Sequence, residues 1–118
     1  MFKLNGTEIS LTRGDTLCLQ VRALRKFTGE EYIPVEGDTI RFAMKHADMV
    51  SGRTAYKDAN PLIIKDIPIS TMQLKLDPID TAGLKFGKYK YDIELTFANG
   101  EVDTIIPDAN FIILPEVH

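Results

Sequence analysis

The sequence predicts an all-β fold, an antiparallel β-sandwich of about eight or nine short strands in a single domain over residues 1–118. Three observations carry this prediction. Hydrophobic residues recur with a period of two along most of the chain, which is typical of strands with one buried and one solvated face. Turn residues separate these runs, and no stretch has helical apolar spacing over three turns. The length of 118 residues fits one domain with one core.

The first half of the chain contains five candidate runs for these strands: Phe2–Leu4, Thr7–Leu11, Thr16–Ala23, Tyr32–Val35 and Thr39–His46. Asn5-Gly6 separates the first two strands and suits a tight hairpin turn, because both residues tolerate positive φ. A Gly-Asp-Thr sequence stands at the start of the third strand and again at the start of the fifth. We interpret both as short turns that lead into a strand.

The second half contains the remaining runs: Leu62–Ile67, Met72–Leu76, Lys88–Phe97, Glu101–Ile106 and Asn110–Leu114. The run Lys88–Phe97 alternates most clearly, and Asn99-Gly100 follows it as a second hairpin turn. One short helical turn is expected near residues 78–83. There Asp77 can cap the helix, Pro78 fits its first position and Gly83 ends it.

Composition and charge exclude several classes of protein. The single cysteine, Cys18, excludes an intrachain disulfide framework and a zinc site with several cysteines. The formal net charge of −3 gives no general reason to bind nucleic acid or anionic lipid. No apolar run is long enough to cross a bilayer, and the first residues do not predict a signal peptide. We therefore expect no nucleic-acid partner and no membrane insertion.

The residues that could carry catalysis favour structural roles. Cys18 lies in mid-strand on the face opposite the leucines, which predicts an inert thiol. His46 ends a strand on its apolar phase, which predicts a half-buried histidine at the rim of the sandwich. Asp92 and Glu94 share a strand face with lysines, as on a solvated surface. We expect neither an enzyme nor a cofactor or metal site.

The stretch Asp48–Pro61 is the longest without periodicity. Loops of this length are often functional, although an ordinary connection between two sheets explains the stretch as well. If it is a binding loop, its contact residues are expected to be Arg53, Tyr56 and Lys57.

The last expected strand departs from simple alternation, because Phe111, Ile112, Ile113 and Leu114 are apolar on both phases and follow Ile105 in the preceding strand. Such a strand either presents one apolar face to a partner or is covered on both faces. The first alternative makes these five residues a partner contact. The second places the N-terminal hairpin over them.

The segment from Leu76 to Ile93 combines a Pro-containing turn, Asp-Thr-Ala, a leucine and Gly-x-Tyr-x-Tyr-Asp-Ile. It resembles the corner of immunoglobulin-like sandwiches, in which a buried tyrosine bonds back to nearby backbone. The resemblance makes Tyr89, with Gly87 and Leu84, a structural tyrosine corner, and it puts Tyr91 where immunoglobulin domains keep their second cysteine. With Arg13-Gly14-Asp15-Thr16 and Asn99-Gly100, the chain resembles small immunoglobulin-like proteins of tailed bacteriophages and prophages, and the N-terminal domain of baseplate upper proteins.

This resemblance implies a virion structural or adaptor protein of a tail or baseplate, without catalytic residues. The implied partners are other tail or baseplate proteins or further copies of the chain. The implied location is the virion, or the bacterial cytoplasm during assembly. The alternative is a module that binds a glycan or a host receptor, for which sandwiches are common scaffolds.

Overall fold

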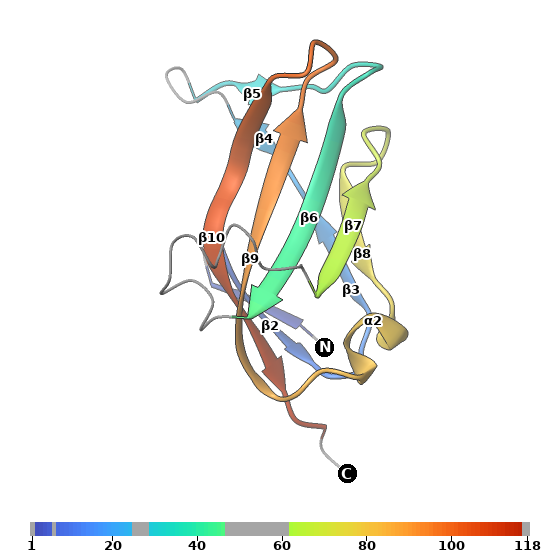
Figure 1. The fold of residues 1–118 in the computed structure, drawn as a ribbon, viewed down its shortest axis with the longest axis vertical. Coiled ribbons are helices and arrows are strands. Elements are labelled where there is room, and N and C mark those ends of the chain that lie inside the picture. Colours follow the sequence, from blue (N-terminus) through green and yellow to red (C-terminus); the bar gives the residue numbers. More distant parts are fainter. Residues whose placement is uncertain (1, 6, 25–28, 47–61, 117–118) are drawn as a thin grey trace.

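The computed structural model describes residues 2–5, 7–24, 29–46 and 62–116. Strands make up 57% of the structure and helical segments 6%, and Figure 1 shows the strands arranged around one core. The predicted all-β sandwich-like fold is confirmed.

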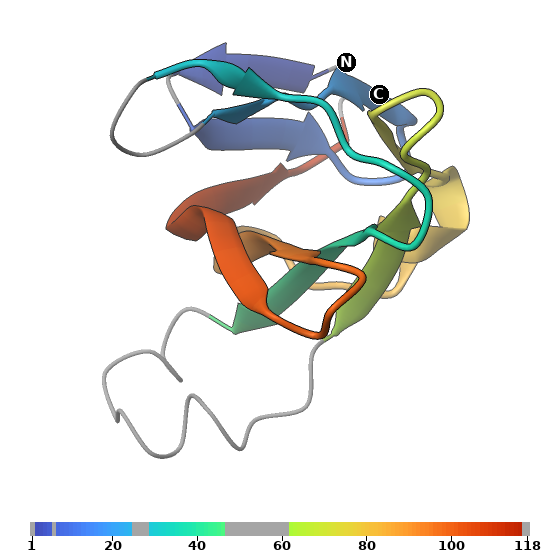
Figure 2. The same cartoon turned by 90° about the horizontal axis from the view of Figure 1, so that it is seen from above.

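A six-stranded sheet forms the larger layer. Its strands, in order across the sheet, are β1 (Phe2–Asn5), β2 (Glu8–Thr12), β10 (Val102–Leu114), β9 (Gly87–Thr96), β6 (Thr39–His46) and β7 (Ile63–Ile67). All neighbours are antiparallel except β2 and β10, which run parallel with Ile9 opposite Phe111. The sheet curls, so the hairpin of β1 and β2 lies behind the front strands (Figures 1 and 2).

The second layer is narrower. Strand β3 (Leu17–Gln20) pairs with β8 (Gln73–Leu76), and β4 (Ala23–Leu24) pairs with β5 (Glu31–Tyr32). Together with the larger sheet, these two strand pairs enclose the hydrophobic core. Figure 2 shows β3 and β5 on the opposite side of the core from β6 and β7.

Some strand boundaries differ from the predicted ones. The last two expected strands are one long strand, β10, whose pairing with β9 shifts register twice between Thr104 and Ala109. Pro107 lies in this irregular stretch, where a missing backbone donor costs least. The expected strand Thr16–Ala23 is divided between β3 and β4, and only Tyr32 of the expected strand Tyr32–Val35 belongs to a strand, β5.

The core lies between the two layers and consists of the inward phases of the strands. At its centre the rings of Phe42, Tyr91 and Phe111 contact one another, with centroids 5.4–6.1 Å apart. Aliphatic residues of β2, β3, β6, β8 and β9 surround these rings. Burial of this apolar surface is the main term that stabilises the fold.

The predicted helical turn is present as α2 (Pro78–Ala82). The backbone N–H of Asp77 donates to the carboxylate of Asp80 at 2.7 Å, which satisfies a polar group at the start of the helix. Thr81 is fully buried, and its hydroxyl accepts a hydrogen bond from the N–H of Gly14 at 3.0 Å. In the described part of the chain no helix is long and apolar enough to span a membrane.

Candidate functional site

The predicted corner residues lie together at the end of the sandwich where β9 begins. The ring of Tyr89 is buried, and its hydroxyl donates to the carbonyl of Lys85, four residues earlier, at 2.7 Å. Burial raises the pKa of Tyr89, and the hydrogen bond to Lys85 opposes this shift. Gly87 has φ of +134°, a value that glycine adopts without strain. The half-buried Leu84 completes the turn by donating its N–H to the carbonyl of Thr81 at 3.0 Å. This arrangement fixes how the chain enters β9.

The expected partner contact on β10 needs correction. Phe111 and Ile113 are buried in the core of the chain itself, so neither offers a surface to a partner. Ile105 and Ile112 are half-buried, and only Leu114 is exposed. The alternative, a hairpin lying over this strand, is also not what the structure contains. Instead, strand β2 of the hairpin pairs with β10 in parallel and so extends the sheet at its edge. In this sheet one set of alternate β10 side chains, which includes Phe111 and Ile113, points into the core.

The other predicted residues have separate positions. Arg53, Tyr56 and Lys57 lie outside the described residues. His46 is exposed at the end of β6, with its ring 5.6 Å from that of Tyr89, so the expectation of a half-buried histidine is wrong. Cys18 is exposed on β3. Within the described ranges, no three His, Cys, Asp or Glu side chains are grouped as metal ligands.

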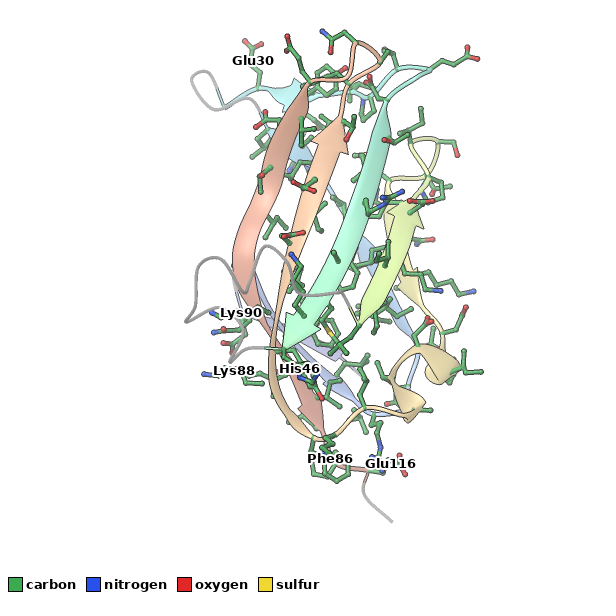
Figure 3. The ribbon with its side chains drawn as sticks, in the orientation of Figure 1. Glu30, His46, Phe86, Lys88, Lys90 and Glu116 are labelled. Atoms are coloured by element: carbon green, nitrogen blue, oxygen red, sulfur yellow. The ribbon has the colours of Figure 1, made fainter. Side chains whose placement is uncertain are left out.

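The outer face of β9 carries both signs of charge. Lys88 and Lys90 lie near His46 at the lower part of this face, as Figure 3 shows. In the next strand Lys45 lies opposite Lys90, and its Nζ is 3.8 Å from the carboxylate of Asp92. Mixed charge of this kind offers no concentrated field for an anionic ligand.

The opposite end of the sandwich is crossed by residues 32–38, which connect β5 to β6. Asp38 is buried, and its hydrogen bonds hold this segment in place. Its carboxylate accepts hydrogen bonds from the Tyr32 hydroxyl at 2.6 Å, the Val35 N–H at 3.0 Å and the Ala98 N–H at 3.1 Å. The bond from Tyr32 is the largest cause that lowers the pKa of Asp38. The ring of Tyr32 also meets that of Phe97, with centroids 5.5 Å apart.

The same tied-down segment exposes two aliphatic side chains. Ile33 is 67% exposed and Val35 is 59% exposed. We call these two side chains the crossing pair. The crossing pair lies on the connection from β5 to β6, at the same end of the sandwich as the turn between β9 and β10, where Ala98 donates its N–H to Asp38. Sequence reasoning missed it because Tyr32–Val35 was expected to be a strand. Pro34 between two aliphatic residues was the available signal against a strand there.

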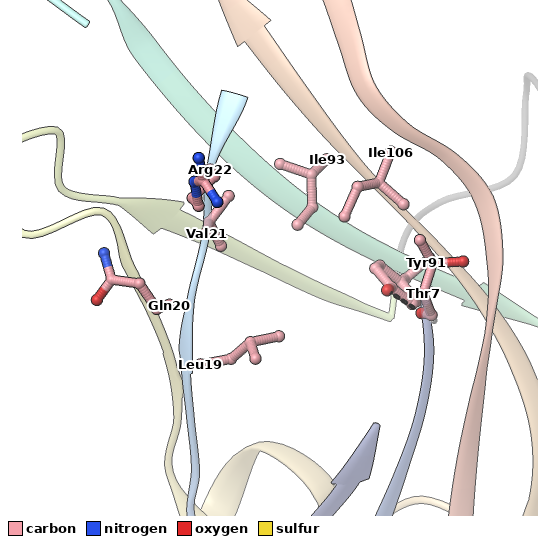
Figure 4. Close-up of a pocket in the computed structure, with 8 residues that line it drawn as sticks. All are labelled: Thr7, Leu19, Gln20, Val21, Arg22, Tyr91, Ile93 and Ile106. Atoms are coloured by element: carbon pink, nitrogen blue, oxygen red, sulfur yellow. Dashed lines mark hydrogen bonds between the residues drawn. The ribbon is translucent and has the colours of Figure 1, made fainter. Parts of the chain in front are cut away.

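A second feature is an apolar opening between the layers beside β3. A cavity of about 150 Å³ lies there between Leu19 and Val21 on one side and Tyr91, Ile93 and Ile106 on the other, as Figure 4 shows. At its far wall the Tyr91 hydroxyl donates a hydrogen bond to the carbonyl of Thr7. Burial raises the pKa of Tyr91 to about 12, so this wall is neutral at physiological pH.

Comparison of the chain with protein-family models, with curated proteins and with solved structures gives no match.

Proposed function

We propose that this chain is a non-enzymatic assembly protein of a phage or prophage tail or baseplate, which acts through protein–protein contacts. The resemblance of the segment from Leu76 to Ile93 to immunoglobulin-like tail proteins supports the phage assignment. The observation that carries the contact role is the crossing pair, Ile33 and Val35, exposed on a segment that Asp38 holds in place.

The crossing pair suits a contact surface for two physical reasons. Each side chain keeps most of its apolar area in water, and its burial against a partner is worth about 1–2 kcal/mol. The segment is also ordered before binding, because Asp38 and Tyr32 fix its backbone. A preordered segment loses little conformational entropy on association. Both properties favour a protein partner with a matching apolar surface.

The test is mass spectrometry of purified phage particles from a strain that produces this chain. The expected result is peptides of the chain at a fixed copy number relative to known tail proteins. Clear absence from the particles, with the protein expressed, contradicts the virion role. The double change Ile33→Ser and Val35→Ser should reduce incorporation. Ile79→Ser is the control, because Ile79 is also an exposed aliphatic residue but lies on α2.

Glycan or receptor binding is the second candidate, because sugars are commonly bound on exposed aromatic faces. Two of the described aromatic residues already have contacts within the chain. Tyr32 contacts Asp38 and Phe97, and the Arg13 guanidinium lies 4.2 Å from the ring centroid of Phe86. Tyr56 is outside the described residues. Saturable binding on a glycan array that Tyr56→Ala abolishes would favour this candidate over assembly.

A further inference from the structure

Strand β3 has an unpaired edge in the described structure. Its hydrogen-bonded strand neighbour is β8, and no described strand pairs with its other side. The N–H of Val21, just after β3, donates to the carbonyl of Met72 at 2.8 Å. Because antiparallel pairs alternate between bonded and non-bonded types, the N–H and C=O groups of Cys18 and Gln20 point away from β8. They form a row of backbone donors and acceptors on the open side.

The cavity described above lies directly beside this edge. Its walls are mostly apolar, and Leu19 and Val21 turn their side chains toward it from β3 and the residues that follow (Figure 4). An engineered protein cavity of about 150 Å³ with aliphatic and aromatic walls holds a benzene molecule. The space at β3 therefore accommodates one aliphatic side chain the size of leucine or isoleucine.

The outward-pointing side chains near this edge determine which charge on an added strand would be complementary. Gln20 and Arg22 point to the solvent side of this layer, as do Gln73 and Lys75 on β8. Arg22 pairs with Glu31 at 3.3 Å, and both side chains are largely exposed, so this ion pair contributes little. An outward carboxylate on an added strand would complement Arg22, whereas Lys75 lies on β8, away from the open edge, with its Nζ 4.0 Å from Asp77.

The described strands of the chain itself do not supply such a segment, because they turn their apolar phases into their own core. The exposed Ile33 and Val35 flank Pro34, which has no N–H to donate to a ladder. No described segment of the chain fits this edge, so we take an extended segment of a different protein as the occupant.

We propose that the free edge of β3 accepts an extended strand from a partner protein, with an aliphatic side chain in the cavity and carboxylates beside Arg22. This proposal deepens the assembly role and rests on it for the biological partner. Main-chain hydrogen bonds to Cys18 and Gln20 provide affinity in this mode, and the cavity provides selectivity. Assembly would then add a third strand to the β3–β8 pair.

The probe is the peptide acetyl-Thr-Val-Glu-Ile-Glu-Val-Thr-amide, titrated into the isotopically labelled chain and followed by NMR. The expected result is saturable binding with slowed hydrogen exchange at the amides of Cys18 and Gln20. Replacing the central Ile of the peptide by Ala should weaken binding on the order of tenfold or more. Replacing both Glu by Lys should also weaken it, and N-methylation of the two Glu should abolish it.

Two variants of the chain locate the site. Gln20→Pro removes an N–H on the open side and should abolish binding. Gln73→Pro is its matched control, because Gln73 is the cross-strand partner and its N–H points to the other edge of β8. Ile106→Phe fills the cavity and should weaken binding at least tenfold. Val102→Phe, an exposed position on the same strand, should not.

Three outcomes overturn the proposal: no saturable binding up to about 1 mM peptide, binding that Gln20→Pro and Ile106→Phe leave unchanged, or a dimer of the free chain with protected Cys18 and Gln20 amides. If Gln20→Pro does not fold, Ile106→Phe and the N-methylated peptide still decide. A chain found in particles that does not bind the peptide keeps the assembly role and loses the strand acceptor. Peptide binding without presence in particles keeps the strand acceptor and loses the virion role.

Discussion

Replacing Tyr91 by Phe should make the fold less sensitive to alkaline pH. Tyr91 is 2% exposed, and its hydroxyl bonds to the Thr7 carbonyl. Burial raises the pKa of Tyr91 from 10.0 to about 12. The folded state therefore retains this proton at a pH where the unfolded chain loses it, so deprotonation favours unfolding.

The magnitude follows from the size of the pKa difference. Because the folded-state pKa is raised, the stabilisation by the neutral phenol is complete below about pH 10 and is lost as the pH rises toward 12. At about 1.4 kcal/mol per pKa unit, the loss is on the order of 2–3 kcal/mol. Tyr91→Phe cannot ionise and should keep this part of the stability. At neutral pH it loses one hydrogen bond, worth about 0.5–1.5 kcal/mol.

Urea unfolding of the parent and the variant between about pH 7 and pH 12 measures both effects. Tyr91→Phe should be the less stable protein at pH 7, and the difference should shrink and reverse as the parent loses stability. Ultraviolet titration of the parent should show a tyrosine that ionises near pH 12, and this step should be missing in the variant. Parallel loss of stability in the two proteins over the whole range would refute the argument that burial controls this phenol.

The remaining predictions concern other described residues. Tyr89→Phe removes the bond to the Lys85 carbonyl and should lower the melting temperature by roughly 2–6 °C, measured by calorimetry; no change would mean that the corner bond adds nothing. Asp38→Asn should reduce stability at neutral pH and flatten its loss in acid. The lowered pKa of Asp38 makes its contribution present above pH 4 or so and lost as the pH falls through the folded value, and identical acid profiles in urea unfolding would contradict this. Phe111→Ala should cost about 3–5 kcal/mol because it opens the core, whereas Leu114→Ala should cost less than about 1 kcal/mol; similar costs in urea unfolding would show that the burial of β10 is misassigned.

The alternation of side chains predicted the layers of this fold well, because a strand with one buried face must place its apolar residues two apart. The run Lys88–Phe97 became β9 almost residue for residue. Alternation does not reveal which strands are neighbours, so the parallel β2–β10 pair was not foreseen. Nor does it distinguish a strand from an extended crossing segment, as residues 32–38 show.

The candidate site was less predictable for a related reason. The sequence singled out apolar residues such as Phe111 and Ile113, yet their exposure depends on which face of β10 meets the core. The cavity beside β3 draws its walls from four separate parts of the chain, including Leu19, Tyr91 and Ile106. No local sequence pattern predicts that such distant segments line one cavity. The corner around Tyr89 could be recognised because all its members lie within a few residues of one another.

The parallel pair of β2 and β10 also affects how the protein folds. Glu8 on β2 and Asn110 on β10, whose side chains are bonded at 3.1 Å, are 102 residues apart in sequence. Contacts between such distant residues form slowly, because a long loop must close before the contact stabilises the chain. During synthesis β2 leaves the ribosome long before β10 is translated. Until then its apolar residues Ile9 and Leu11 lack their neighbours on β10. Folding of the six-stranded sheet is therefore completed only after translation has passed β10, and until then the apolar residues of β2 are open to aggregation.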